Sequence, residues 1–136
     1  MYRKTQHSVY SITLHLVLVV KYRRDVINDI ISNRIRDIFD NIGLAHDVEI
    51  IEWNYDKDHI DTIISISPAT NITKYVNATK SASSRLIKKE FPDVKEKLWK
   101  DCFWTVGFYV NSTDSTQTDV VENYILQQGE NWCYSL

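Results

Sequence analysis

A histidine and a carboxylate stand two positions apart in the stretch DKDHIDTIISI, residues 56–66. The β-branched residues of its second half predict a strand that begins at the histidine, and alternate residues of a strand share one face. His59 and Asp61 are therefore expected on the same face, together with Ile63. A neutral imidazole and a carboxylate both bind divalent cations, and the carboxylate favours hard ions such as Mg²⁺ or Mn²⁺. Two ligands do not hold a metal alone, so a third is expected from another element.

Tyr124 and Gln128 are candidates for completing such a site. They stand four positions apart in a predicted helix over residues 118–128, so both project from one face of that helix. A glutamine oxygen can complete the shell of a hard metal ion, and a hydroxyl one turn away is placed to attack a phosphate that the ion polarises. Because the ordinary pKa of tyrosine is about 10, this hydroxyl needs a nearby cation or base to become a nucleophile.

The same residues also have purely structural interpretations. A histidine at the start of a strand is more often structural than a ligand. Asp61 beside Thr62 fits a solvated strand edge, and Tyr124 follows Val120 and Val121 at a spacing that suits packing. Single residues therefore do not decide between packing and chemistry.

Basic residues cluster locally in a chain whose formal net charge is −2 and whose pI is about 6.1. That balance gives no global case for nucleic-acid binding, so any DNA surface has to be local. One cluster follows the first predicted strand, and the other forms two adjacent stripes on the second predicted helix. Such side chains bind phosphates and position a nucleic acid without reading its sequence. The candidate DNA-binding residues are Lys21, Arg23, Arg24, Lys80, Ser84, Arg85 and Lys88.

Length and composition fit one globular domain over residues 1–136, with 43% hydrophobic residues. The opening stretch MYRKTQHSVYSITLHLVLVVKYRR does not read as a signal peptide, because His15 interrupts its apolar part and basic residues close it without a small-residue cleavage site. The apolar run over 12–20 is also too short to span a bilayer. We therefore expect a cytoplasmic protein that is not embedded in a membrane.

The element pattern predicts an α+β fold. Strands are expected at 9–20, 48–54, 59–66 and 103–111. Helices are expected from 28 or 29 to Gly43, from about 71 to 90 and over 118–128, and STDSTQ before the last of them is expected to be a loop. The order β-α-β-β-α-β-α describes a ferredoxin-like sandwich with one antiparallel sheet, helices on one face and the tyrosine on the C-terminal helix. This fold hosts many functions and does not decide the chemistry.

Several blocks together resemble one family, the small single-tyrosine HUH transposases of bacterial insertion sequences, the TnpA type that acts on single-stranded DNA. The blocks are HSVYSITLHLVLVVKYRR, EIIEWNYDKDHIDTIISI, KSASSRLIKKEFP, LWKDCFW and VVENYILQQ, and they cover nearly the whole chain.

The resemblance implies a role for each candidate residue. In the family, the third strand carries His-hydrophobe-His as metal ligands, and the final helix carries a tyrosine that nicks DNA and forms a 5′-phosphotyrosine link. A polar residue one turn further supplies a third ligand. His59, Tyr124 and Gln128 match this pattern, whereas Asp61 stands in place of the second histidine. The loop NSTDSTQ also lacks the glycines expected before the tyrosine helix.

The resemblance further implies a partner and an assembly. The ligand is single-stranded DNA folded into hairpins at the ends of the element, the cofactor is Mg²⁺ or Mn²⁺, and two subunits form a homodimer that shares its active sites. The first hypothesis is thus a metal-dependent transposase that nicks and rejoins single-stranded DNA. The second is a decayed or repurposed relative that binds hairpin DNA without cleaving it. A third, an RNA-binding βαββαβ domain, ranks lowest because the sequence has no RNP-type signature.

Overall fold

The computed structural model describes residues 2–4, 8–113 and 118–130 of the chain. Its strands are β1 (Arg3–Lys4), β2 (Val9–Tyr10), β3 (Ile12–Val19), β4 (Glu49–Asp56), β5 (His59–Ile66) and β6 (Tyr109–Ser112). Its helices are α1 (Asp29–His46), α2 (Ile72–Glu90), α3 (Pro92–Lys97) and α4 (Thr118–Glu130), with short 3₁₀ turns η1 (Lys21–Arg23) and η2 (Trp99–Asp101).

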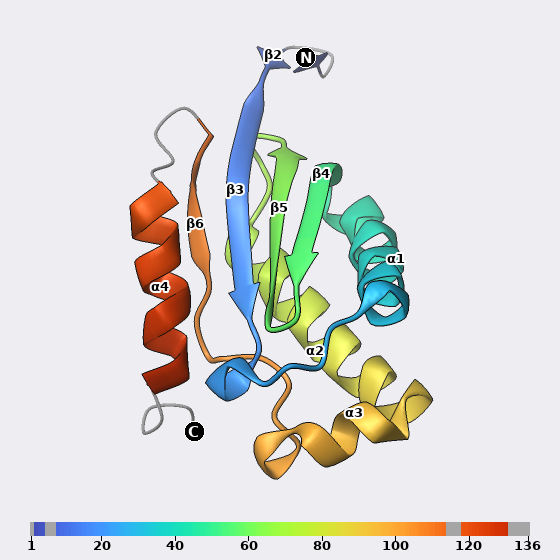
Figure 1. Cartoon of the computed structure of the whole chain (residues 1–136). Helices are drawn as coiled ribbons and strands as arrows, with labels where there is room; N and C mark the ends of the chain where they lie inside the picture. The colour runs from blue at the N-terminus through green and yellow to red at the C-terminus, as the bar shows by residue number, and fades with distance from the viewer. Residues whose placement is uncertain (1, 5–7, 114–117, 131–136) are drawn as a thin grey trace.

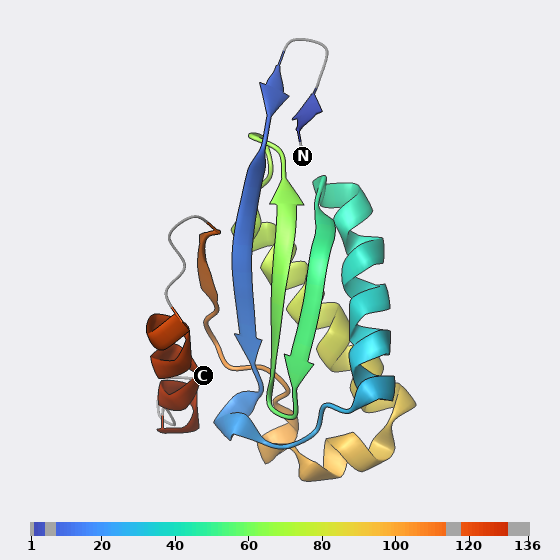
Figure 2. The same cartoon turned by 45° about the horizontal axis from the view of Figure 1, so that its top comes forward.

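Four strands form one antiparallel sheet in the order β4-β5-β3-β6. Helices α1 and α2, the crossover connections, lie together on one face of this sheet (Figure 1). The predicted α+β, ferredoxin-like arrangement is confirmed. The prediction that the helices lie on one face holds for α1 and α2 but not for α4. Helix α4 is the addition: it packs along the opposite face, beside β3 and β6 (Figures 1 and 2).

The central strand β3 explains how both faces come to be covered. Leu16 and Leu18 point into the main core with α1 and α2, and Val17 and Val19 point into a smaller cluster with α4. All four side chains are completely buried. A strand covered on both faces has a nearly continuous apolar sequence, which is why the LVLV stretch shows no polar alternation.

The end of α1 differs from the prediction that Gly43 terminates the helix. The helix continues to His46 and ends at Asp47, whose φ of 58° is left-handed. The chain then folds back so closely that a Cβ on Gly43 would lie 2.5 Å from the Val48 carbonyl oxygen, while the Val48 N–H donates to the Gly43 carbonyl at 3.0 Å. Gly43 therefore permits a close backbone approach inside the helix rather than ending it.

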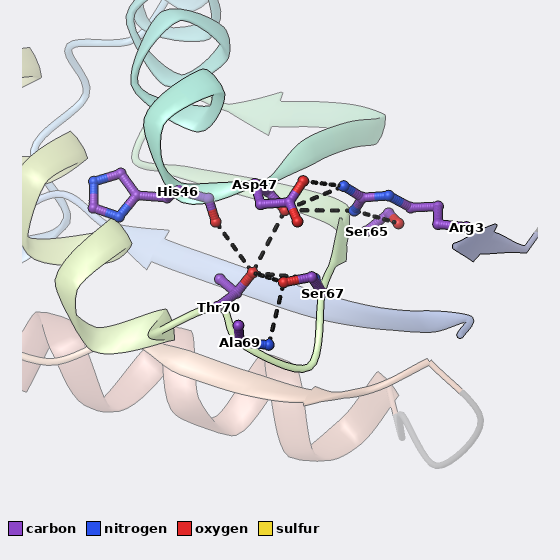
Figure 3. Close-up of polar contacts among 7 residues, drawn as sticks. All are labelled: Arg3, His46, Asp47, Ser65, Ser67, Ala69 and Thr70. Atoms are coloured by element: carbon purple, nitrogen blue, oxygen red, sulfur yellow. Dashed lines mark hydrogen bonds and ion pairs between the residues drawn. The ribbon is translucent and has the colours of Figure 1, made fainter. Parts of the chain in front are cut away.

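A polar cluster fastens this turn to the start of the chain and to the loop after β5 (Figure 3). Arg3 forms an ion pair with the Asp47 carboxylate, and Thr70 donates its hydroxyl to the His46 carbonyl at 3.1 Å. The Ser67 hydroxyl in turn lies 3.1 Å from that of Thr70. These contacts hold the C-terminal end of α1 against the start of α2.

The predicted strand over 103–111 is the main departure. Of this stretch, β6 alone pairs with β3. Phe103 and Trp104 enter the main core instead, and Trp104 forms an isolated bridge to Val20. Their aromatic and apolar character reflects burial and not strand pairing. Helix α3 and the β1–β2 pair were not predicted, and residues 114–117 of the expected STDSTQ loop lie outside the described residues. Within the described part of the chain, no helix has the length and apolarity needed to cross a bilayer.

Candidate active site

The face of the sheet that carries His59 and Asp61 is the face on which α4 lies. His59 stands opposite Val19 in the β3–β5 register, and Asp61 stands opposite Val17. Both valines pack against Val121 of α4. The alternation of β5 thus places the pair on one side of the strand, as predicted. The packing of Val121 on Val17 and Val19 puts the C-terminal helix on the same side.

His59 is held by a carboxylate that the sequence analysis did not single out. Its Nδ1 lies 2.7 Å from Oδ1 of Asp58, and Oδ2 of Asp58 accepts from Nε of Arg23 at 2.9 Å. Burial alone would raise the pKa of Asp58, but the hydrogen bonds and charges of His59 and Arg23 outweigh it and lower that pKa. An ionised Asp58 fixes the imidazole proton on Nδ1, which leaves the Nε2 lone pair for a ligand. The available signal was the carboxylate directly preceding the histidine.

Asp61 also has a partner that the sequence analysis missed. Its Oδ1 is in close contact with Nε2 of His15, which extends from the neighbouring strand β3. His15 also meets Tyr109 edge to face at 6.0 Å between ring centres. A cavity of about 250 Å³ opens over this pair, lined by His15, Glu52, Asn54, Asp61, Ile63 and Thr113. In the sequence His15 was visible only as a polar interruption in an apolar run, because its partner lies on another strand.

Tyr124 and Gln128 share one face of α4, as their spacing predicts. Tyr124 packs against the cluster of Val17 and Val19 on the sheet and Val121 on α4, and its ring lies 5.8 Å from that of Tyr109. Gln128 is 7% exposed, and its Nε2 donates to the backbone carbonyl of Tyr124 at 3.3 Å. The polar groups of both residues are therefore held against the protein in this arrangement.

The Tyr124 hydroxyl lies against the segment that precedes β6. A Cβ on Gly107 would be 3.7 Å from this hydroxyl, and the hydroxyl of Thr105 is close by. Both hydroxyl oxygens are shielded from solvent, and neither forms a well-aligned hydrogen bond with a described residue. Burial raises the pKa of Tyr124, and the Thr105 hydroxyl offsets only part of this rise. The phenol is thus protonated and covered.

The structure places the two halves of the predicted site on one face, with no hydrogen bond between them among the described residues. Among the described residues, the hydrogen bonds of His59 and Asp61 go to Asp58 and His15, not to Tyr124 or Gln128. Over the same residues, no group of three or more His, Cys, Asp or Glu is arranged to hold a metal ion. A metal at this face would therefore need a ligand of another type, such as the Gln128 amide.

Three of the predicted DNA-binding residues line one basic cleft. Ser84, Arg85 and Lys88 of α2 border a cavity of about 500 Å³ that is completed by Ser81, Lys89, Lys95 and Asp101. Lys88 also donates to the Asp101 carbonyl at 2.8 Å. The cleft thus joins α2 to the segment around α3 and η2 and gathers the local positive charge that the sequence predicted.

The other predicted basic residues have different surroundings. Lys21 is 1% exposed, with its ammonium 5.2 Å from the ring centre of Tyr22 and 5.8 Å from that of Trp99. Arg23 binds Asp58, Arg24 is exposed, and Lys80 donates to three backbone carbonyls. Lys21 and Lys80 therefore turn their charges into the fold.

The whole arrangement was compared with known proteins. Residues 8–128 match the family described as "Transposase IS200 like". The chain belongs to this family. The IS200-like match covers both the strand with His59 and the helix with Tyr124.

Named relatives agree with this assignment. The chain is 29% identical over 126 residues to the ISDra2 transposase TnpA of Deinococcus radiodurans, covering 93% of this chain and 90% of the relative. It is 27% identical over 124 residues to the transposase for insertion sequence element IS200 of Salmonella typhimurium, covering 91% and 81%.

Solved structures show the same fold. A crystal structure at 1.90 Å resolution of a Deinococcus radiodurans R1 protein assigned as a transposase superposes with a TM-score of 0.83 at 25% identity, covering 93% of this chain and 97% of that one. A REP-associated tyrosine transposase bound to a REP hairpin superposes with a TM-score of 0.59 at 12% identity, covering 92% and 68%. The second likeness concerns the fold alone.

Proposed function

We propose that this IS200-like transposase nicks and rejoins single-stranded DNA at hairpin-marked element ends, with Tyr124 as the nucleophile. The observation that carries the proposal is that α4 packs its Tyr124 face onto the sheet face that presents His59 and Asp61. Family membership supports transposition as the activity.

The proposed step is an attack of the Tyr124 oxygen on a backbone phosphorus. The new bond joins that oxygen to phosphorus, the bond from phosphorus to the 3′ oxygen breaks, and the DNA retains a 3′ hydroxyl while the protein carries a 5′-phosphotyrosine. The phenol loses a proton and the leaving oxygen gains one, and the reverse reaction rejoins a strand without ATP. Because the hydroxyl is covered and burial raises the pKa of Tyr124, it has to leave its present position before it reacts.

His59, Asp61 and Gln128 are proposed to hold one Mg²⁺ or Mn²⁺ ion. The fit rests on the ring of His59, because Asp58 occupies Nδ1 and leaves Nε2 available, as in typical metal-binding histidines. Asp61 supplies a carboxylate on the same face, and an amide oxygen suits a hard ion. When bound, the ion would polarise the scissile phosphate and stabilise charge on the 3′ oxygen.

The DNA is proposed to contact the basic cleft through Ser84, Arg85 and Lys88, with Arg24 as a further exposed cation. Cations in a cleft attract phosphates without sequence preference, as the stem of a hairpin requires. Lys21 is left out of this surface, since its ammonium lies inside the fold. We further propose a cytoplasmic homodimer with shared active sites, in which the Tyr124 helix leaves its own sheet, where it now packs, to meet the ligand strand of the partner subunit.

The test uses the wild-type protein with a single-stranded oligonucleotide that carries an imperfect hairpin, in the presence of Mn²⁺. A covalent protein–DNA adduct on a denaturing gel, mapped by mass spectrometry to the peptide containing Tyr124, is the expected result. Absence of an adduct from a protein that binds the hairpin would contradict cleavage by the natural sequence.

One arrangement favours a second candidate, a relative that binds hairpins without cutting them. The carboxylate of Asp61 is engaged by His15 instead of being free for a metal. The variant Asp61→His separates the candidates. An adduct formed only by the variant identifies the natural protein as binding-only, and an adduct already formed by the natural protein excludes that candidate.

The Asp58 carboxylate provides a further prediction. Asp58→Asn removes the charge that orients His59, and we expect Mn²⁺ affinity to fall by about 10- to 100-fold. Titration calorimetry measures the affinity directly. Asp56→Asn is the matched control, since Asp56 is exposed and its carboxylate accepts from the neighbouring Lys57 N–H. Equal affinities for both variants would argue against an orienting role of Asp58.

A further inference from the structure

Lys80 makes an unusual set of contacts for a lysine on a helix. Its ammonium donates to three successive carbonyls, those of Thr105 at 2.6 Å, Val106 at 2.8 Å and Gly107 at 3.2 Å. An ammonium has three protons, so these bonds use its whole donor capacity. No carboxylate of the described residues lies within ion-pair distance of it. Within the described part of the chain, the groups that balance the charge are therefore these carbonyl dipoles.

Burial makes this position costly for a cation. It lowers the pKa of Lys80 to about 8. The cost is offset only while the three carbonyls stay where they are, because hydrogen bonds to a charged donor are stronger than neutral ones. The lysine and the segment 105–107 thus constrain one another.

Apart from Lys80, few backbone hydrogen bonds of regular secondary structure hold the segment 105–107. Thr105 donates its N–H to the Val19 carbonyl at 2.9 Å, but β6 does not begin until Tyr109. Among the described residues, a Cβ added to Gly107 would meet only the Tyr124 hydroxyl within 4 Å, at 3.7 Å. The backbone that Lys80 fixes is therefore the backbone against which the phenol rests.

We propose that Lys80 is a positioning residue for the tyrosine nucleophile: by holding segment 105–107 it maintains the shielded seat of the Tyr124 hydroxyl. The inference rests on the proposed role of Tyr124 for its functional meaning. Its structural content is independent of that role. The sequence analysis placed Lys80 on a DNA-binding stripe. The inference instead gives Lys80 a structural role, which is to keep the Tyr124 hydroxyl covered in the absence of DNA.

The test is nitration of tyrosines by tetranitromethane in DNA-free protein, measured peptide by peptide with mass spectrometry. Lys80→Met keeps the length of the side chain and removes all three bonds, and we expect Tyr124 nitration to accelerate about tenfold or more as the segment opens locally. Tyr75, which is completely buried in the main core, should remain unmodified and so reports an intact fold.

Lys88→Met is the matched control. Lys88 lies on the same helix, carries the same charge and donates to one carbonyl, that of Asp101. Its loss should leave Tyr124 nitration at the wild-type rate. The proposal is overturned if Lys80→Met leaves Tyr124 as slow as in the wild type with Tyr75 protected, or if Lys88→Met accelerates it equally.

If Lys80→Met also exposes Tyr75, then Lys80→Arg is scored in its place. A planar guanidinium keeps the charge but cannot meet three converging carbonyls as an ammonium does, so about a two- to fivefold acceleration is expected. No acceleration overturns the proposal. Because nitration requires neither DNA nor catalysis, a failed adduct assay with accelerated nitration removes the nucleophile assignment alone, and the reverse outcome removes only the role of Lys80.

Discussion

Replacing Tyr124 by phenylalanine should lower the rate of DNA nicking by at least about 1000-fold, because the variant lacks the oxygen that becomes bonded to phosphorus. The ring remains, so its packing with Val17, Val19 and Tyr109 should persist. Hairpin affinity should stay within about threefold of the wild type, since the basic cleft is untouched. Single-turnover cleavage and a binding titration measure the two quantities separately.

Tyr109→Phe is the appropriate control. It removes a hydroxyl from the ring adjacent to Tyr124, and that hydroxyl accepts from the Asn111 amide at 3.3 Å. Nicking by this variant should remain close to the wild-type rate. If Tyr124→Phe still forms a covalent adduct, another side chain is the nucleophile and the proposed chemistry is wrong.

Replacing Phe39 by alanine should lower the free energy of unfolding by about 3–5 kcal/mol, the range for deletion of a buried aromatic side chain. Phe39 is completely buried, and it meets Trp53 at 5.4 Å and Tyr75 at 6.3 Å between ring centres. It therefore joins α1 to the sheet and to α2. Urea unfolding followed by tryptophan fluorescence measures the loss.

Leu44→Ala gives the comparison on the same helix. Leu44 is 84% exposed, and leucine and alanine have similar helix propensities, so the change should be within about 0.5 kcal/mol. A loss below about 1 kcal/mol for Phe39→Ala would mean that the aromatic cluster is not a main source of stability.

Local sequence patterns predicted the helices and strands whose bounds depend mainly on neighbouring residues. The bounds of β5 agree at both ends, because a turn precedes the strand and Pro68 follows it. The strand expected over 103–111 is confirmed only at its end, in β6. The prediction is wrong for residues 103–108, because buried aromatics in an irregular segment have the composition of a strand. Helix α3 was not predicted, although it begins at Pro92 and proline suits the first turn of a helix.

For the candidate site, too, arrangements within one element were predictable and contacts between elements were not. A shared face follows from spacing within one element, so the sides of His59 with Asp61 and of Tyr124 with Gln128 were predictable. Partners from other elements were not. Neither the pairing of His15 with Asp61 nor the carbonyls around Lys80 has a counterpart in the local sequence.

Arg23 touches two parts of the site at once. Its methylene groups lie against Gly129 near the end of α4, where a Cβ would come within 2.9 Å of Cδ, while its guanidinium binds Asp58. Lifting the helix would expose those methylene groups to water and remove the packing that holds Arg23 in place beside Asp58, the carboxylate that orients the His59 imidazole. The packing of α4 and the orientation of the His59 ring are thus energetically linked, and such linkage works in both directions. A ligand that binds through His59 should therefore also change how tightly α4 packs on the sheet.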